Sequence, residues 1–569
     1  MNVPERVSST DRVLLALVAI AVVALALRLY DLGGRVAHWD EARVAYDAMR
    51  YLRTGVWQFR PVVHGPFLPK VNHQVFDLLG ASDTTMRLVV AVIGGLAPLA
   101  AWLFRRHLRR EELVILGLLL AANPVLLYYS RFYRNDVALG VVMLVAFGMF
   151  VRAYDTKRPF YLYPAFALVA LGWTMKGNAL LYPVVWIGAV AVLADQYAVM
   201  HHDGEGGAVG YLRRQIHSSA SIILAWRWHL IGSTLLGLLV IITFYLPRDG
   251  ETVTLTEVLF APWRLPELLD VTLVDSTQRM LSHWFAASGE TPYLSFLEHY
   301  IETLLAGASV VLVFAIIGFI ADRYRPGQAR ALVTIAALWG FVSIVGYPIA
   351  ADIRAPWLTV HAIIPLTIPA AVGLGFMYRT AIGNLRDIDT PSGDSLVVGG
   401  IAALVLLLAV VAVIYPALTL VYLQPTDADN QLAQYAQPGG DWGDTIEVML
   451  ALAETNDEGV DVLYAGDTFF MLDEDDAYLK PASGGWYNRL PLPWYFEQVD
   501  ATTASAADRS TVAEVIEEER PPIVIAAQSD RHLVIDHVEG YESRFHTLRL
   551  WDMHVDIYLD IDRLDEANP

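Results

Sequence analysis

The feature that most constrains the fold of this chain is a series of apolar segments, each long enough to cross a lipid bilayer. A spanning helix needs about 20 predominantly apolar residues. The sequence contains about eleven such candidates, near 12–30, 86–104, 111–128, 136–152, 160–174, 178–196, 228–246, 301–321, 331–349, 358–378 and 397–423. Because a segment inside a bilayer must satisfy its own backbone hydrogen bonds, this series predicts a polytopic α-helical membrane protein. The first segment lacks a small-residue cleavage site, so we expect it to be a retained anchor.

The positive charges of the loops predict the orientation of the chain. Four basic clusters fall in loops of the same parity, at 105–110, 156–158, 213–214 and 323–325. Loops rich in arginine and lysine are predominantly cytoplasmic, so we expect a cytoplasmic N-terminus and, with an odd number of spans, an external C-terminal part. The two long loops at 31–85 and 247–300 then face outward, and 31–85 carries two amphipathic stretches, at 41–53 and 66–79. The predicted location is the cell membrane, crossed many times.

The texture of the sequence changes at Gln424, which predicts a membrane domain over 1–423 and a soluble external domain over 424–569. Helix-like and strand-like stretches alternate in the second part, at 444–454, 460–466, 510–520, 521–528, 544–551 and 554–560. Such alternation is typical of a small α/β domain. This part carries no glycine-rich phosphate loop and no nucleophile elbow.

The net charge of −20 is concentrated in the C-terminal part, which contains 31 acidic and 8 basic residues from Pro425 onward. The ordinary interpretation of such acidity is a solvated face. Together with the scarcity of lysine, it also resembles the proteins of salt-loving archaea. An acidic exterior disfavours a nucleic-acid partner.

The sequence contains no pattern that is typical of a metal or cofactor site. The chain has no cysteine, which excludes disulfides and thiolate-bound metals. Its histidines lack the spacing typical of a zinc site. We therefore predict no cofactor and leave the need for a divalent metal open.

Ionisable and aromatic residues gather at the predicted external ends of the spans. They lie in the stretches "HWDEAR", "VVHGPFLP", "SRFYRND", "WTMKGN" and "ADIRAPWLTVH", and the candidates are Trp39, Asp40, Glu41, His64, Arg131, Arg134, Asp136, Lys176, Arg354 and His361. Charges near bilayer depth are costly and tend to face a shared cavity. Arginine and lysine suit a phosphate, and a carboxylate beside a bound hydroxyl suits a general base. One site with both kinds of group suits transfer from a lipid phosphate to an acceptor.

Each candidate also has a structural interpretation. Asp40 and Glu41 can also be first-turn acids at the N-terminus of the following helix, although we favour a site there. The arginines can fix the depth of a span, Lys176 can be an interfacial anchor, and Trp39 can belong to an aromatic belt.

At these residues the chain resembles the membrane glycosyltransferases of the GT-C fold, including the dolichyl-phosphate-mannose–protein mannosyltransferases and the lipid A aminoarabinose transferases. "HGPFL" is similar to their H/K-P-P-L element, with Gly65 where the first proline is usual, and "MKGNALLYP" is similar to their T-K-G…P element. The order of "YYSRFYRNDV", "APWLTVHAIIP" and "LPLPWYFE" resembles an archaeal subgroup of flippase-associated proteins of dolichol-linked glycan assembly.

The resemblance implies an inverting glycosyltransferase that uses a polyprenyl-phosphate sugar outside the membrane, in glycosylation of surface proteins. Asp40 would be the general base with Glu41 beside it. Arg131, Arg134, Lys176, Arg354 and His361 would bind the lipid phosphate or donor, and His64, Asp136 and Trp39 would line the cavity. Other glycan-assembly proteins are possible partners.

Two points keep the alternatives open. The metal-binding acidic pairs and the W-W-D-Y-G motif of the larger oligosaccharyltransferases have no counterpart here, so we do not expect oligosaccharide transfer to protein. The resemblance to flippase-associated proteins instead suggests an alternative function: a non-catalytic protein that binds dolichol-phosphate glycans and assists their translocation.

Overall fold

The computed structural model describes residues 9–59, 64–200, 207–279, 282, 292–325, 329–351, 353–386, 393–440, 442–456, 458–472, 474, 484–550 and 553–567. Parts of the predicted external loops, at 60–63, 280–281 and 283–291, lie outside these ranges. The chain forms two compact units. Unit 1 comprises 1–30, 56–68 and 88–423, and unit 2 comprises 31–55, 69–87 and 424–569.

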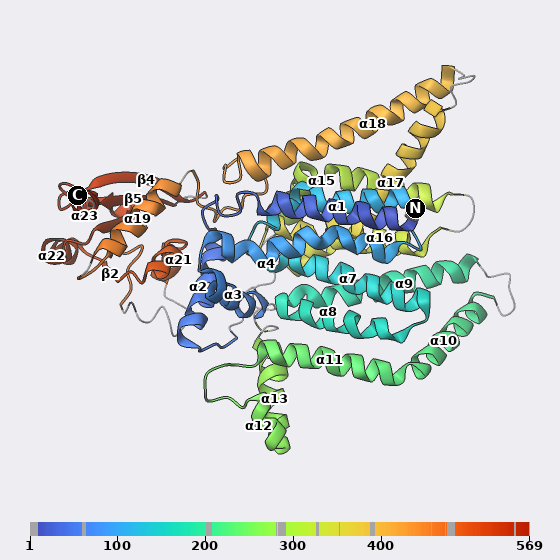
Figure 1. Cartoon of the computed structure of the whole chain (residues 1–569), viewed down its shortest axis with the longest axis horizontal. Coiled ribbons are helices and arrows are strands. Elements are labelled where there is room, and N and C mark those ends of the chain that lie inside the picture. The colour runs from blue at the N-terminus through green and yellow to red at the C-terminus, as the bar shows by residue number, and fades with distance from the viewer. Residues whose placement is uncertain are drawn as a thin grey trace, which may run out of the picture. The chain divides into compact units, whose positions relative to one another are not determined.

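Long helices dominate unit 1, and most of them run side by side in Figure 1. Their bounds are α1 Ser9–Leu29, α5 Arg110–Ala122, α6 Pro124–Tyr129, α7 Asn135–Thr156, α8 Leu162–Met175, α9 Leu181–Met200, α10 Gly207–Ala225, α11 Arg227–Tyr245, α12 Leu255–Phe260, α13 Leu265–Leu269, α15 Tyr293–Arg323, α16 Ala331–Ala350, α17 Val360–Arg386 and α18 Gly393–Leu418. Helices α3 (Phe67–Leu79) and α4 (Asp83–Leu96) contribute residues to both units.

Nine segments of the described chain are long and apolar enough to cross a membrane, which confirms the polytopic prediction. The other two predicted spans are shorter helices. The span predicted at 160–174 is the apolar helix Pro159–Met175, and that at 111–128 divides into α5 and α6. The break falls at Asn123, whose side chain accepts a hydrogen bond from the Leu126 backbone as the N-cap of α6, with Pro124 at its first position. Proline is well tolerated there because its missing N–H is not needed.

Helix α17 is the core of unit 1. In the candidate span that contains α17, Pro356–Leu385, 89% of the apolar stretch is buried inside the protein. In the span that contains α18, Ser395–Leu423, the buried share is 17%. Close approach of α15 to α17 depends on Gly318 and Gly373, because a Cβ on either would overlap the other helix's backbone at Pro369 or Phe314. Small residues at such crossings are typical of helix packing in membranes.

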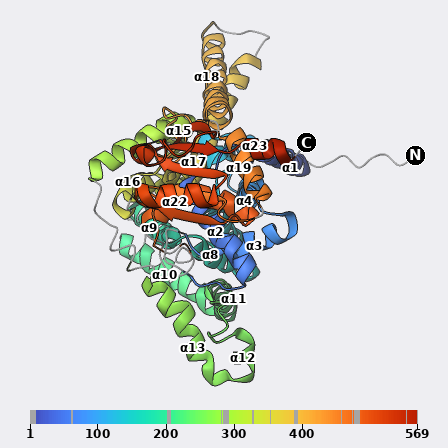
Figure 2. The same cartoon turned by 90° about the vertical axis from the view of Figure 1, so that its left-hand side faces the viewer.

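Unit 2 contains a five-stranded sheet of order β2-β1-β3-β5-β4. The bounds are β1 Val462–Ala465, β2 Thr503–Ala506, β3 Ile523–Ala527, β4 Glu542–Arg549 and β5 Met553–Leu559. Strand β1 pairs in parallel with β2 and β3, while β5 runs antiparallel to β3 and β4. Besides parts of α3 and α4, the described helices of this unit are α2 Trp39–Thr54, α19 Gly443–Thr455, α20 Gly484–Arg489, α21 Leu492–Phe496, α22 Arg509–Glu519 and α23 Asp562–Ala567. Figure 2 labels α2, α19, α22 and α23.

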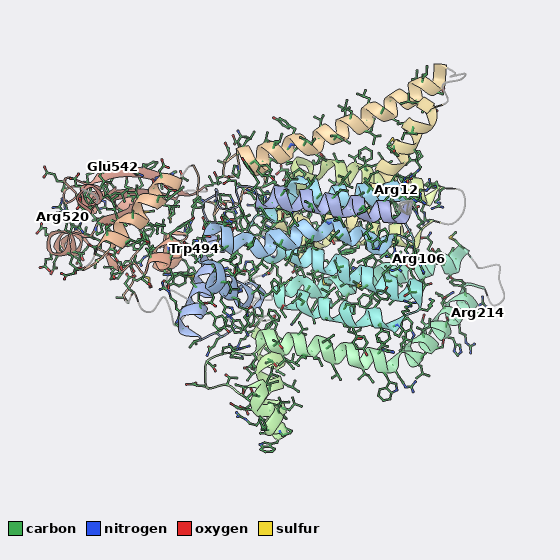
Figure 3. All side chains as sticks on the ribbon, in the orientation of Figure 1. Arg12, Arg106, Arg214, Trp494, Arg520 and Glu542 are labelled. Carbon is green, nitrogen blue, oxygen red and sulfur yellow. The ribbon has the colours of Figure 1, made fainter. Side chains whose placement is uncertain are left out.

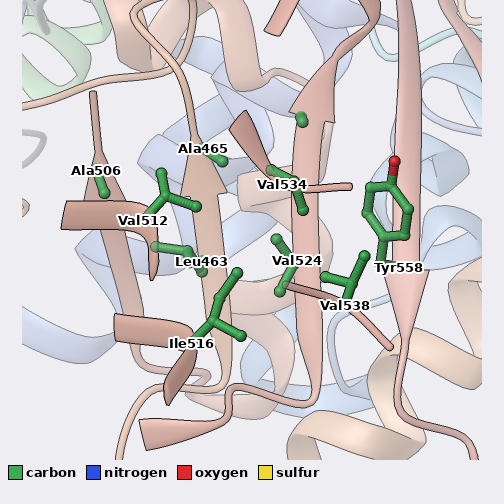
Figure 4. Close-up of a cluster of buried hydrophobic side chains, with 10 residues drawn as sticks. Leu463, Ala465, Ala506, Val512, Ile516, Val524, Val534, Val538 and Tyr558 are labelled. Carbon is green, nitrogen blue, oxygen red and sulfur yellow. The ribbon is translucent and has the colours of Figure 1, made fainter. Parts of the chain in front are cut away.

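Alternation along the strands separates the two faces of this sheet. Leu463 and Val524 pack against Val512 and Ile516 of α22 in one buried apolar cluster (Figure 4). Tyr464, between Leu463 and Ala465, belongs to the opposite face because successive side chains of a strand alternate. The predicted α/β domain is confirmed, and the amphipathic stretches 41–53 and 66–79 are helices α2 and α3.

Candidate functional site

The candidate residues divide between the two units. Asp40, Glu41 and Trp39 belong to unit 2, whereas His64, Arg131, Arg134, Asp136, Lys176, Arg354 and His361 belong to unit 1. Each group is therefore described within its own unit.

In unit 1 a buried carboxylate gathers basic side chains from three segments of the chain. Asp136, in the first turn of α7, accepts a hydrogen bond from Lys176 Nζ at 2.7 Å, and His361 Nε2 lies 3.1 Å from the same oxygen. Arg134 Nε is 3.5 Å from the other oxygen. All four side chains are at least nine-tenths buried. Lys176 follows α8 and His361 lies at the start of α17, so packing of α7, α8 and α17 assembles this cluster.

His361 is held by a second layer of polar and aromatic groups. Tyr182 Oη lies 2.5 Å from His361 Nδ1, and the Tyr347 ring stacks on the imidazole at 4.8 Å between ring centroids. The amide nitrogen of Asn178 also lies 3.1 Å from His361 Nε2. Contacts to both ring nitrogens therefore fix the orientation of the imidazole beside Asp136.

Arg134 combines a charge with an aromatic face. Its guanidinium carbon lies 3.6 Å from the ring centroid of Trp357, a cation–π contact. Beside it, Asn135 is fully buried, and within the described part of the chain neither of its amide atoms has a hydrogen-bond partner. Two cations and an amide therefore meet beside one buried carboxylate.

Two other predicted phosphate ligands are placed differently. Arg131 donates to the backbone carbonyls of Leu27, Arg28 and Tyr30, at the C-terminal end of α1. It thereby caps a helix end, where cations are favourable. Arg354 is exposed and donates to Ser295 Oγ at 3.1 Å.

His64 lies close to the Lys176 segment along the backbone. Its side chain is 5% exposed, and the next residue, Gly65, donates from its backbone N–H to the Met175 carbonyl at 2.8 Å. A Cβ at position 65 would overlap the Thr174 carbonyl. This explains why glycine replaces the proline expected from the resemblance.

In unit 2 the stretch "HWDEAR" forms the start of α2. His38 is the N-cap, and its Nδ1 accepts a hydrogen bond from the Asp40 backbone at 2.9 Å. His38 Nε2 then carries the proton and donates to Gln434 Oε1 at 2.7 Å. Glu41 completes a capping box by accepting from the His38 backbone. The structural interpretation, in which Asp40 and Glu41 are first-turn acids of a helix, is confirmed.

Glu41 is locked in a buried ion pair. Arg87 Nε and Nη2 each donate to one of its oxygens at 2.9 Å, and Arg35 Nη2 donates at 2.9 Å. Burial alone would raise the pKa of Glu41, but the charges of Arg35 and Arg87 and the hydrogen bonds from Arg87 and the His38 backbone lower it to about 2. The carboxylate holds the segment in place and stays ionised.

Asp40 differs from its neighbour. Its side chain is 10% exposed and pairs with Arg43 at 3.3 Å, one turn further along α2. The Arg43 guanidinium lies over the Trp39 ring at 4.7 Å, and Trp39 Nε1 donates to the Tyr487 carbonyl at 2.8 Å. The Asp40 carboxylate is therefore held by an ion pair within α2, whereas that of Glu41 is held by arginines from outside this helix.

The tail residues Trp494 and Tyr495 hold this segment, and sequence reasoning missed their role. Tyr495 Oη accepts from the Ala37 backbone at 2.7 Å and donates to Asp83 Oδ2 at 2.8 Å. Trp494 Nε1 donates to the other Asp83 oxygen at 2.8 Å. Both residues lie in "LPLPWYFE", one of the motifs that carry the resemblance. The motif marks these residues in the sequence, but it does not indicate that they contact Ala37 and Asp83.

Within the described ranges, no group of three or more histidine, aspartate or glutamate side chains is arranged to hold a metal ion.

Comparison with known proteins identifies the class of fold. Residues 63–204 match the family model of dolichyl-phosphate-mannose-protein mannosyltransferase, and residues 442–560 match that of the Agl23 flippase-associated protein C-terminal domain. A comparison of the sequence with curated proteins finds no match.

Two solved structures resemble the whole chain. One is ArnT from Cupriavidus metallidurans bound to undecaprenyl phosphate, with a TM-score of 0.56, 16% identity, and coverage of 97% of this chain and 98% of that chain. The other is the oligosaccharyltransferase AglB from Archaeoglobus fulgidus in complex with an inhibitory peptide and a dolichol-phosphate, with a TM-score of 0.51, 13% identity, and coverage of 95% and 73%. Both have the GT-C fold of membrane glycosyltransferases, and the predicted resemblance and fold are confirmed.

Proposed function

We propose that this chain is a glycosyltransferase that uses a polyprenyl-phosphate-linked sugar on the external face of the cell membrane. The observation that carries the proposal is the buried cluster of Asp136, Lys176, Arg134 and His361 in a protein of the GT-C fold. Lysine and arginine are the side chains that bind phosphate oxygens most strongly. The two solved relatives hold undecaprenyl phosphate and a dolichol-phosphate.

The external face is supported by the basic residues of unit 1. Arg12, Arg106 and Arg214 lie at the same end of the helices in Figure 3. By the positive-inside tendency that end is cytoplasmic. Asp136 and His361, at the helix starts of α7 and α17, belong to the loops of the opposite parity.

In the proposed reaction an acceptor hydroxyl attacks the anomeric carbon of the donor, and the bond from that carbon to the phosphate oxygen breaks. The polyprenyl phosphate leaves with the bonding electrons, and the proton of the hydroxyl passes to the general base, the role that the resemblance to the GT-C transferases gives to Asp40. Lys176 and Arg134 stabilise the negative charge that grows on the leaving phosphate. A single displacement inverts the anomeric centre. Glu41 acts as a positioning residue, because its carboxylate is already engaged by Arg35 and Arg87.

The match of residues 442–560 favours a second candidate: a non-catalytic flippase-associated protein that binds dolichol-phosphate glycans and aids their translocation. In that role Lys176 and Arg134 would still bind the lipid phosphate. Asp40 would not be required, because binding needs no general base.

The test is reconstitution of the full chain in liposomes with radiolabelled dolichyl-phosphate mannose and dolichyl-phosphate glucose as donors and glycoproteins of the native cell surface as acceptors. We expect Asp40→Asn to keep lipid binding while transfer falls by roughly 10²–10⁴-fold, the usual contribution of a general base. Lys176→Met should weaken binding of both lipids. Asp429→Asn and Lys157→Met, which change exposed residues, are the matched controls.

Undiminished donor consumption in Asp40→Asn would contradict the base assignment. The non-catalytic alternative is correct if Lys176→Met weakens lipid binding but neither the wild type nor any variant transfers sugar.

A further inference from the structure

A cavity in unit 2 has a chemistry that the proposed transfer does not explain. Its volume is about 220 Å³. The lining consists of Tyr46, Tyr464, Glu474, Trp486, Arg489, Pro493, Phe496, Glu497, Ala501, Thr502 and Thr503. These residues come from α2, β1, the segment 486–497 and the start of β2, together with Glu474 between β1 and α20, all within unit 2.

One part of the wall is aromatic. The rings of Tyr46 and Trp486 meet edge to face at 5.2 Å between centroids, and Tyr464 packs against Phe496. Rigid aromatic faces of this kind receive flat ligand surfaces at little entropic cost.

Another part is a preformed pair of charges. Arg489 is 2% exposed and donates to both oxygens of Glu474, at 2.6 and 2.9 Å, while its guanidinium lies over the Tyr464 ring at 4.1 Å. Thr503 Oγ1 also donates to Glu474, at 3.2 Å. In the described contacts, the Arg489 guanidinium uses three of its five N–H groups, two for Glu474 and one for the Phe469 carbonyl. A ligand in the cavity is therefore offered both N–H donors of Arg489 and acceptor lone pairs of Glu474.

Tyr464 adds an independent observation. It is 1% exposed, and among the described residues its hydroxyl has no hydrogen-bond partner. A buried polar group without a partner is costly, so a ligand that hydrogen-bonds this hydroxyl would relieve the cost.

Together these features select the ligand class. A pyranose ring presents an apolar face of C–H groups to an aromatic wall and a rim of hydroxyls that both donate and accept. Both carboxylates of the lining are paired with an arginine, Glu474 with Arg489 and Glu497 with Arg53, so the charges of the wall are balanced and do not favour an anion. The volume is below the roughly 300–1,000 Å³ of clefts for drug-sized ligands, so it suits a single ring.

We propose that this cavity binds one neutral hexose ring of the acceptor glycan. The assignment to the acceptor rests on the proposed function and on helix α2, which carries both Asp40 and Tyr46. Six residues along a helix correspond to about 9 Å, so the cavity and the proposed base are held in a fixed relation by one rigid element.

The test measures binding of methyl α-mannopyranoside, methyl α-glucopyranoside and methyl β-galactopyranoside to the full chain in detergent, by saturation-transfer NMR. At least one hexoside should bind. Trp486→Leu should raise its Kd about tenfold, and Tyr464→Phe, which removes only the hydroxyl, by roughly 2–10-fold. Phe545→Leu removes an exposed aromatic of the same unit and should have no effect.

Absence of saturable binding of all three hexosides, or equal binding by wild type and both cavity variants, would overturn the inference. Tyr464→Phe keeps the test valid if Trp486→Leu does not fold. Donor transfer in the same preparations separates the two proposals. Normal transfer with Trp486→Leu refutes the cavity as an acceptor site and leaves the proposed function standing. The expected binding pattern without any transfer refutes the proposed function and leaves a saccharide site.

Discussion

Replacement of Glu41 by glutamine is the sharpest test of how the start of α2 is held. The glutamate is fully buried, and two arginines and a backbone N–H donate to its carboxylate. Glutamine keeps the shape but removes the charge. Arg87 would then be a buried cation with weakened compensation.

Two arguments give the same magnitude. The pKa of Glu41 falls from 4.5 to about 2 on folding, and this shift corresponds to roughly 3 kcal/mol of stability at neutral pH. Breaking a buried ion pair by removing one partner costs about 3–5 kcal/mol. In a unit of this size 1 kcal/mol moves the unfolding midpoint by roughly 2–4 °C. We therefore expect Glu41→Gln to lower the midpoint by roughly 6–12 °C at pH 7.

The pH dependence has a definite sign. A carboxyl whose pKa is lowered by folding contributes its full stability above the unfolded pKa of 4.5 and loses it as the pH falls toward 2. The difference between wild type and Glu41→Gln should therefore be constant from pH 7 to about 5 and shrink below it. Thermal unfolding of the detergent-solubilised chain, followed by tryptophan fluorescence, measures this. Glu518→Gln, on the exposed face of α22, is the control.

A midpoint unchanged at pH 7, or a difference that persists undiminished at pH 2, would refute the reasoning. In either case the ion pair with Arg35 and Arg87 would not be what holds the segment.

Two further predictions concern neighbouring contacts. Tyr495→Phe removes the hydroxyl that accepts from Ala37, so we expect about 1–3 kcal/mol of destabilisation and reduced transfer with lipid binding retained; wild-type stability would contradict the role of this hydroxyl. Arg131→Met removes the cap of α1, so the unfolding midpoint should fall by a few degrees while the Kd for dolichyl phosphate stays unchanged. A weakened Kd at wild-type stability would instead restore Arg131 as a phosphate ligand.

Much of the fold was predictable because it depends on local patterns. Apolar length defined the spans, and the alternation after Gln424 defined α19, β1, α22 and β3. Strand β2 was missed because "TASA" is small and polar, without the β-branched or aromatic residues that signal a strand. The break at Asn123 was missed because hydropathy averages over a capping residue and a proline.

The candidate site was predictable as a set of residues, but their partners were not. Lys176 and His361 could be named from their positions near helix ends, whereas their meeting at Asp136 depends on the packing of α7, α8 and α17. Arg131 carries the same charge and stands three residues before Arg134, yet it serves the end of α1. Which arginine reaches a cluster is decided by tertiary geometry that a single sequence does not contain.

The adjacent acids of "HWDEAR" show that a helix cap and a site are compatible interpretations. Glu41 helps to fix the turn by accepting hydrogen bonds from Arg35, Arg87 and the His38 backbone. Asp40 follows the rigid N-cap and pairs with Arg43 at 3.3 Å. Glu41 supplies the structural role, while the ion pair with Arg43 orients the Asp40 carboxylate. These separate roles predict different phenotypes. Loss of Glu41 is expected mainly to reduce stability, and loss of Asp40 mainly to reduce sugar transfer.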